Sequence, residues 1–180
     1  MANGGEYRSW VESLLRKWEE LRSRGEIWEA LELVEKAEEL CPEGDPLRIE
    51  VEYSLAISLL ETGKDLAKAS RIFQKIVEVF ERTLPPDHPD LQTARSNLAL
   101  TLRDLGDLHS AKGLQEKVLE IEERTLPPDH PDLQTARGNL ASTLYMLGDL
   151  HSAKALQEKV LEIEERTLPP DHPDLQTARG

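Results

Sequence analysis

Residues 83–95 read TLPPDHPDLQTAR, and the same string recurs at residues 125–137 and 167–179, a period of 42 residues. The two complete copies, 83–124 and 125–166, differ at five positions. These are Ser96/Gly138, Leu100/Ser142, Arg103/Tyr145, Asp104/Met146 and Gly113/Ala155. Self-similarity at such a period indicates an array in which each repeat is one supersecondary unit. The third copy stops at Gly180.

Each copy reads as two helices. Asp87 is expected to cap the first helix, with Pro89 in its first turn. The apolar stripe that follows has the three- and four-residue spacing of a helix and comprises Leu91, Ala94, Leu98, Leu102 and Leu105. Gly106-Asp107 predicts the break. The second stripe runs through Leu108, Ala111, Leu114, Val118 and Ile121, until Pro127-Pro128 forbids further helix.

Two helices of this size cannot bury their apolar stripes alone, so neighbouring units must stack into an all-α solenoid. We divide the chain into two N-terminal helix pairs (1–82), two near-identical repeats (83–166) and the start of a further repeat (167–180). In the second N-terminal pair, we expect helices over about 46–62 and 66–82, joined by a reshaped turn at Gly63-Lys64-Asp65.

At these residues the sequence resembles the tetratricopeptide repeat family. The resemblance rests on Asn97-Leu98-Ala99 with its copy at 139–141, the Gly-Asp turn, and the alanine five residues after each glycine, Ala111 and Ala153. The 42-residue period with its Asp-His-Pro-Asp loop resembles the long variant of kinesin light chains. Upstream, the family's shorter 34-residue spacing is matched by Gly25, Ala30, Ala37 and Pro42. The resemblance implies a right-handed superhelical solenoid of antiparallel helix pairs that binds peptides on its concave face.

Composition excludes several classes of partner. The chain of 180 residues carries a net charge of -13, which disfavours nucleic acid and anionic membranes and favours a neutral or basic partner. No run approaches the length of an apolar membrane span, and residues 1–10 lack the apolar run of a signal peptide. Cys41 is the only cysteine, so no internal disulfide exists. We therefore expect a cytoplasmic protein.

No motif in the sequence predicts catalysis, a metal or a cofactor. The histidines fall in two repeat registers, His88, His130 and His172, and His109 and His151. One repeat separates each from the next, so we expect them to make loop and helix-start hydrogen bonds rather than bind zinc. Cys41 precedes Pro42 at a helix end and is expected to pack rather than react.

Two further groups have a structural and a functional interpretation. Paired carboxylates such as Glu122-Glu123 are expected to be solvated charges on a helix face. The tryptophans Trp10, Trp18 and Trp28 all fall in the first helix pair. They could form an aromatic cage, but we expect them to pack a bulky N-terminal unit.

The differences between the two copies predict where a ligand binds. Ser96, Leu100, Arg103 and Asp104 fall on one stripe of the first helix, opposite its packing stripe. The resemblance places this face on the concave groove. The alternative is neutral drift, but the exposed face of the second helix has not drifted at all. The candidate ligand-binding residues in this register are Leu15, Glu19, Arg22, Tyr53, Ile57, Leu60, Glu61, Ser96, Asn97, Leu100, Arg103, Asp104, Gly138, Asn139, Ser142, Tyr145 and Met146.

Three hypotheses for function follow. The first is a non-catalytic scaffold that binds a peptide or protein. We also expect weak end-to-end self-association through Val160, Leu161 and Ile163, which a following repeat would normally cover. The second is an engineered or idealised scaffold without a natural ligand, suggested by the near-identity of the copies. The third is a regulatory array cut from a larger caspase-like protease or signalling ATPase, because similar arrays are appended to such proteins.

Overall fold

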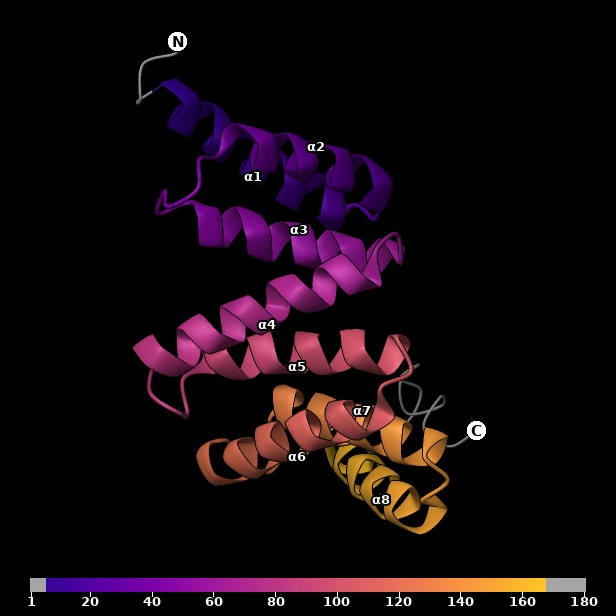
Figure 1. The fold of residues 1–180 in the computed structure, drawn as a ribbon. Coiled ribbons are helices and arrows are strands. Elements are labelled where there is room, and N and C mark those ends of the chain that lie inside the picture. The colour runs from indigo at the N-terminus through magenta and orange to yellow at the C-terminus, as the bar shows by residue number, and fades with distance from the viewer. Residues whose placement is uncertain (1–5, 168–180) are drawn as a thin grey trace. The chain divides into compact units, whose positions relative to one another are not determined.

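The computed structural model describes residues 6–167, and all regular structure in that range is helical. Its helices are α1 (Glu6–Ser23), α2 (Ile27–Leu40), α3 (Arg48–Thr62), α4 (Leu66–Thr83), α5 (Pro89–Asp104), α6 (Leu108–Thr125), α7 (Pro131–Met146) and α8 (Leu150–Thr167). The chain divides between Thr83 and Leu84 into two compact units. Unit 1 holds α1–α4 and unit 2 holds α5–α8. Within each unit successive helices run antiparallel and pack on one another, as the array predicts (Figure 1).

The helix boundaries in unit 2 follow from capping residues. Gly106 and Gly148 adopt left-handed backbone, with φ of 86° and 84°, and so turn the chain after α5 and α7. Asp107 then caps α6 through its Oδ1 atom, which accepts a hydrogen bond from the Ser110 amide at 3.2 Å. The predicted Gly-Asp break is thus confirmed.

The predicted cap of the first repeat helix is wrong by one residue. His88, not Asp87, is the N-cap of α5, and its ring Nδ1 accepts from the Asp90 amide at 3.2 Å. His130 caps α7 in the same way. The imidazole reaches the amide because the proline that follows holds φ at the value of a first helical residue. The expected helix-start role is confirmed for these two histidines, and His172 lies outside the described residues.

The core of unit 2 is aliphatic. One cluster of it comprises Val118, Leu119, Leu133, Ala136, Leu140, Leu144 and Ala153, with Leu126 and Leu156 packed against them. The predicted stripe of α5 is buried at Leu91, Ala94 and Leu98. Leu105 is exposed, because it follows the last residue of α5 and the chain has already begun to turn.

Unit 1 buries Phe73, Leu31, Leu55 and Ile76. Trp18 is buried, and its Nε1 donates to Ser58 Oγ at 2.7 Å. The expectation that all three tryptophans pack is wrong for Trp10 and Trp28, which are 68% and 55% exposed. The helices at 46–62 and 66–82 are confirmed to within two residues.

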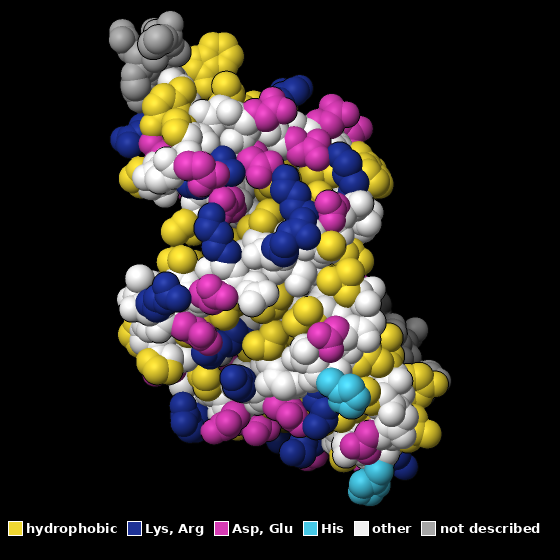
Figure 2. Space-filling view, viewed as in Figure 1, with side chains coloured by type: hydrophobic (Ala, Val, Ile, Leu, Met, Phe, Trp, Pro, Cys, Tyr) yellow, Lys and Arg dark blue, Asp and Glu magenta, His cyan; other side chains and the backbone are white. Residues whose placement is uncertain are grey.

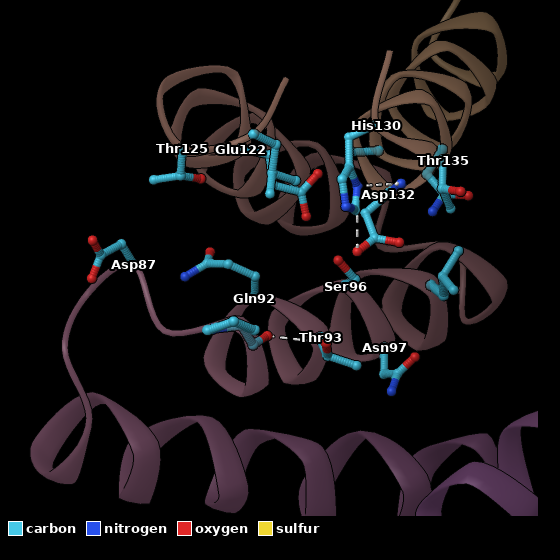
Figure 3. Close-up of a pocket in the computed structure, with 15 residues that line it drawn as sticks. Asp87, Gln92, Thr93, Ser96, Asn97, Glu122, Thr125, His130, Asp132 and Thr135 are labelled. Carbon is cyan, nitrogen blue, oxygen red and sulfur yellow. Dashed lines mark hydrogen bonds and ion pairs between the residues drawn. The ribbon is translucent and has the colours of Figure 1, made fainter. Parts of the chain in front are cut away.

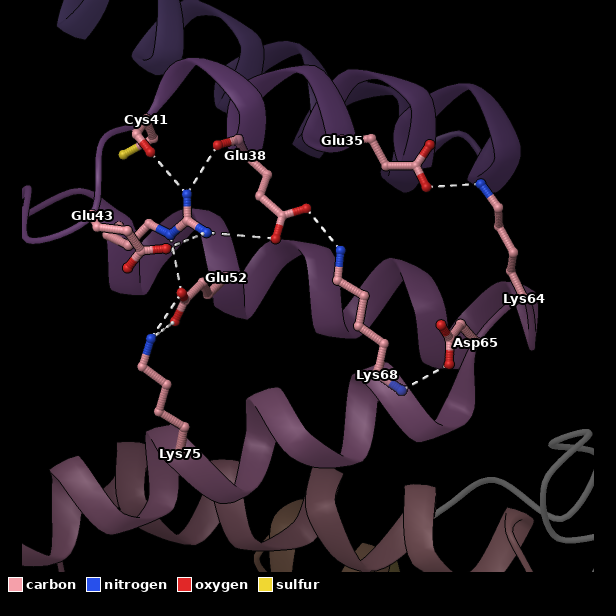
Figure 4. A network of polar contacts seen from close by, with 10 residues as sticks. Glu35, Glu38, Cys41, Glu43, Glu52, Lys64, Asp65, Lys68 and Lys75 are labelled. Carbon is pink, nitrogen blue, oxygen red and sulfur yellow. Dashed lines mark hydrogen bonds and ion pairs between the residues drawn. The ribbon is translucent and has the colours of Figure 1, made fainter.

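Charged side chains join the helices of unit 1. Arg48 donates to the carbonyl oxygens of Glu38 and Cys41 at 2.9 and 2.8 Å and pairs with Glu43 and Glu52 (Figure 4). Lys75 of α4 also pairs with Glu52, with Nζ and Oε2 2.9 Å apart. On the visible face of unit 1, Lys and Arg side chains lie beside Asp and Glu (Figure 2).

Candidate functional site

The candidate site is a groove in unit 2 between the N-terminal halves of α5 and α7, closed at one side by the end of α6 (Figure 3). Its volume is about 450 Å³. Four of the predicted ligand-binding residues line it, namely Ser96, Asn97, Leu100 and Asn139. They meet there because α5 and α7 present the same helix face one repeat apart.

The remaining predicted residues of unit 2 lie outside this groove. Tyr145 and Met146 are 65% and 53% exposed, as expected of a ligand-facing surface. Gly138 and Ser142 are exposed too. Arg103 is half-buried and pairs with the exposed Asp104, with Nη2 and Oδ1 2.9 Å apart.

In unit 1, Leu15 is 7% exposed, so its assignment to a ligand-facing surface is wrong. It follows Val11 by four residues and precedes Trp18 by three, which places it on the buried stripe of α1. Glu19 is exposed, as expected.

The other predicted residues of unit 1 already have partners or lie half-buried. Arg22 Nε pairs with Glu61 Oε1 at 2.8 Å, and its guanidinium lies over the Trp18 ring. Tyr53 is half-buried with its ring edge-on to Phe73. Ile57 and Leu60 are half-buried as well.

Sequence reasoning missed the acidic wall of the groove. Glu122 is half-buried rather than solvated, whereas the neighbouring Glu123 pairs with Arg137 at 3.2 Å. The Glu122 carboxylate is directed toward the same space as His130 and Asp132 (Figure 3). The comparison of the two copies could not find Glu122, because the copies are identical there.

The environment of Glu122 disfavours its charged form. Its Oε2 atom is buried and has no hydrogen-bond partner. Burial raises the pKa of the Glu122 carboxyl above its ordinary value, Asp132 raises it further, and His130 opposes them. A cationic group in the groove would reverse this, since opposite charge favours the ionised carboxylate.

A second polar group lies beneath the groove. Gln115 of α6 is 4% exposed, and neither its amide nitrogen nor its amide oxygen has a partner. It faces a recess of about 10 Å³ that Ser96, Ala136 and Asn139 border, and these three residues also line the groove. The recess has room for one group about the size of a water molecule.

The groove offers hydrogen bonding and charge, because carboxylates, amides, hydroxyls and an imidazole line it. Cys41 is buried in unit 1, and burial raises the pKa of its thiol, which disfavours the reactive thiolate. Within residues 6–167, no three His, Cys, Asp or Glu side chains gather in a way that could hold a metal ion. No helix of this range has both the length and the apolar character needed to cross a bilayer.

Comparison with known structures shows the same fold. A kinesin light chain candidate from Podosopora anserina with nearly identical TPR-like repeats is 24% identical, with a TM-score of 0.77. The match covers 95% of this chain and 82% of that one. BtubC (BKLC) from P. vanneervenii is 18% identical, with a TM-score of 0.74 over 98% of this chain and 71% of that one. MamA from Desulfovibrio magneticus RS-1 is 18% identical, with a TM-score of 0.66 over 88% and 78%.

The family comparison covers most of the array. No curated protein matches the sequence. The model of the tetratricopeptide repeat, however, matches residues 47–124 and 90–166, and so spans both near-identical copies and the helix pair before them. The chain therefore belongs to the tetratricopeptide repeat family.

Proposed function

We propose that the chain is a non-catalytic scaffold whose unit 2 groove binds an extended peptide segment of neutral or basic character. The observation that carries the proposal is the groove itself, in which residues from two successive repeats converge on about 450 Å³. Side-chain amides and a hydroxyl from Ser96, Asn97 and Asn139 suit the main chain of a peptide, which presents a donor and an acceptor at each residue.

We propose that the residues that changed between the copies and lie outside the groove extend the ligand-binding surface. Tyr145 and Arg103 are of the types most enriched at binding hot spots, because each offers a large contact area with a polar end. We propose that they contact the ligand where it leaves the groove. Under the alternative of an idealised scaffold, no peptide would be selected.

The test is selection of short peptides from a random library on the immobilised chain, followed by affinity measurement with two variants. Asn139→Ala should weaken the selected peptides. Replacing Arg103 and Tyr145 together by Ala should weaken them by about 2 kcal/mol, the usual hot-spot threshold. That double variant should change the free energy of unfolding by only about 0.5 kcal/mol, because the Tyr145 side chain is exposed and the Arg103–Asp104 pair is partly solvated.

Selection of no peptide, or peptides that bind all variants equally, would contradict the proposal.

Location in the cytoplasm and weak self-association through Val160, Leu161 and Ile163 remain predictions. These three side chains are half-buried, and the residues after Thr167 lie outside the described range.

A further inference from the structure

The groove carries a one-sided charge. Three carboxylates line it, from Asp87, Glu122 and Asp132, and the lining includes no Lys or Arg. This differs from unit 1, where Glu38 and Glu52 are paired with Arg48 and with the lysines of α4. The charge in the groove is therefore left for a ligand to neutralise.

Of these three carboxylates, Glu122 is the one that the fold partly buries. Asp132 is largely exposed and lies 3.8 Å from the His130 ring, and Asp87 is exposed on its loop. The Oε2 atom of Glu122 is buried without a partner. An unpaired charge in such a place is costly, and a cationic donor would remove the cost.

Gln115 supplies an independent indication of a ligand. A buried primary amide that leaves its donors and its acceptor unused is rare in folded proteins, since nearly all buried polar groups have partners. The recess in front of Gln115 shares the lining residues Ser96 and Asn139 with the groove. A main-chain carbonyl or amide of a bound peptide is of the right kind and size to enter it.

The two groups are spaced for one ligand. Gln115 and Glu122 are seven residues apart on α6, which is about 10.5 Å along the helix. An extended peptide covers this distance in about three residues. A main-chain group at Gln115 and a long cationic side chain at Glu122 can therefore belong to the same short segment.

We infer that the unit 2 groove recognises a peptide segment containing a lysine or arginine, with Glu122 as the receptor for the cationic group and Gln115 as a hydrogen-bonding partner for the main chain. This rests on the proposed peptide-binding function and adds the chemical class of the ligand and the residues that select it. A metal ion is a poorer fit, because the described carboxylates do not gather into a set that could hold one.

The experiment uses the full 180-residue chain and short acetylated, amidated peptides with mixed neutral flanks. Their central residue is Lys, Arg, norleucine or Glu, and norleucine keeps the four-carbon chain of lysine without its ammonium group. Lys and Arg peptides should bind at least about 10-fold more tightly than norleucine peptides, as expected for a charge-assisted hydrogen bond in a half-buried site.

Matched variants assign the effect. Glu122→Gln should abolish the preference for Lys over norleucine, whereas Glu120→Gln, the same change on the exposed face of α6, should preserve it. Gln115→Met should weaken Lys and norleucine peptides alike. In carbon-detected NMR titrations, the Lys peptide should lower the pKa of the Glu122 carboxyl and the norleucine peptide should not. A residue with only a structural role would not show this difference.

The outcomes separate the two proposals. If no peptide binds, both the proposed function and this inference fail. If norleucine peptides bind as well as Lys peptides, or Glu122→Gln keeps the preference for Lys, the peptide-binding function stands and the cation receptor is wrong.

Discussion

Two glutamates show how differently the two units treat a carboxylate on the inner side of a helix. Glu52 of unit 1 is 5% exposed and accepts hydrogen bonds from Lys75 and Arg48 at 2.9 and 3.0 Å. Burial acts to raise the pKa of Glu52, but these two cations together hold it below its ordinary value. Glu122 of unit 2 has a buried oxygen without a partner, and its pKa is raised.

The difference indicates which carboxylate serves the fold and which is available to a ligand. A buried charge that is paired and hydrogen-bonded becomes part of the structure, and removing its partner is costly. A charge left unpaired destabilises the free protein and gains when a cation arrives. Glu52 of unit 1 is thus satisfied within the fold, whereas Glu122 and Gln115 of unit 2 have buried polar atoms without a partner beside a groove.

The largest expected effect is at Glu52. Replacing Glu52 by Ala leaves the half-buried Arg48 without its partner on α3. The free energy of unfolding should fall by about 3 kcal/mol, as for a broken buried ion pair. This value is at the low end of the range because Arg48 still pairs with Glu43. Urea denaturation at neutral pH measures the change. Glu50→Ala, on the exposed face of α3, is the control and should have little effect.

The contributions of Glu52 and Glu122 to stability should depend on pH with opposite signs. Because its folded pKa is lowered, Glu52 adds stability above the pKa of the unfolded chain, and this is lost as pH falls through the folded pKa. Glu122, with a raised folded pKa, costs stability as pH rises from the unfolded pKa through the folded one.

Glu122→Gln should therefore raise the free energy of unfolding at neutral pH, by about 1 kcal/mol or less because the side chain is partly solvated. The gain should shrink as the pH is lowered below the ordinary carboxyl pKa, where wild-type Glu122 is also neutral. Parallel urea titrations of the variant and wild type at several pH values measure it. A variant that is less stable than wild type at neutral pH would show that Glu122 has a stabilising partner.

The fold was predictable because each copy of the repeat carries the same turn and capping residues. Gly106-Asp107 and Gly148-Asp149 each place a left-handed glycine before a capping aspartate, and this chemistry is local. Trp10 and Trp28 show where local reasoning ends. A tryptophan can be placed on a helix from the sequence, but its burial depends on whether another helix covers that face.

The candidate site was predictable only on the helix face where the copies differ, which also carries Asn97 and Asn139. Ser96 and Leu100 were identified because they changed, whereas Gln115 and Glu122 are the same in both copies. Gln115 and its copy Gln157 have near-identical sequence neighbours, yet Gln115 is buried and Gln157 is exposed. The burial of Gln115 comes from α7 packing against α6, so the local sequence does not encode it.

The smallest expected effect is at Gln115, and it decides whether unit 2 truly leaves a polar group unsatisfied. Gln115→Met keeps the length of the side chain and removes an amide without a partner, so the free energy of unfolding should be unchanged or rise by up to about 1 kcal/mol. Gln157→Met, the same change at the exposed copy, is the control for helix propensity and should be neutral. Thermal and urea unfolding of both variants measure the difference.

If Gln115→Met instead lowers stability while Gln157→Met does not, the amide is satisfied in solution by water in the recess. The evidence for an unsatisfied polar group beside the groove would then rest on Glu122.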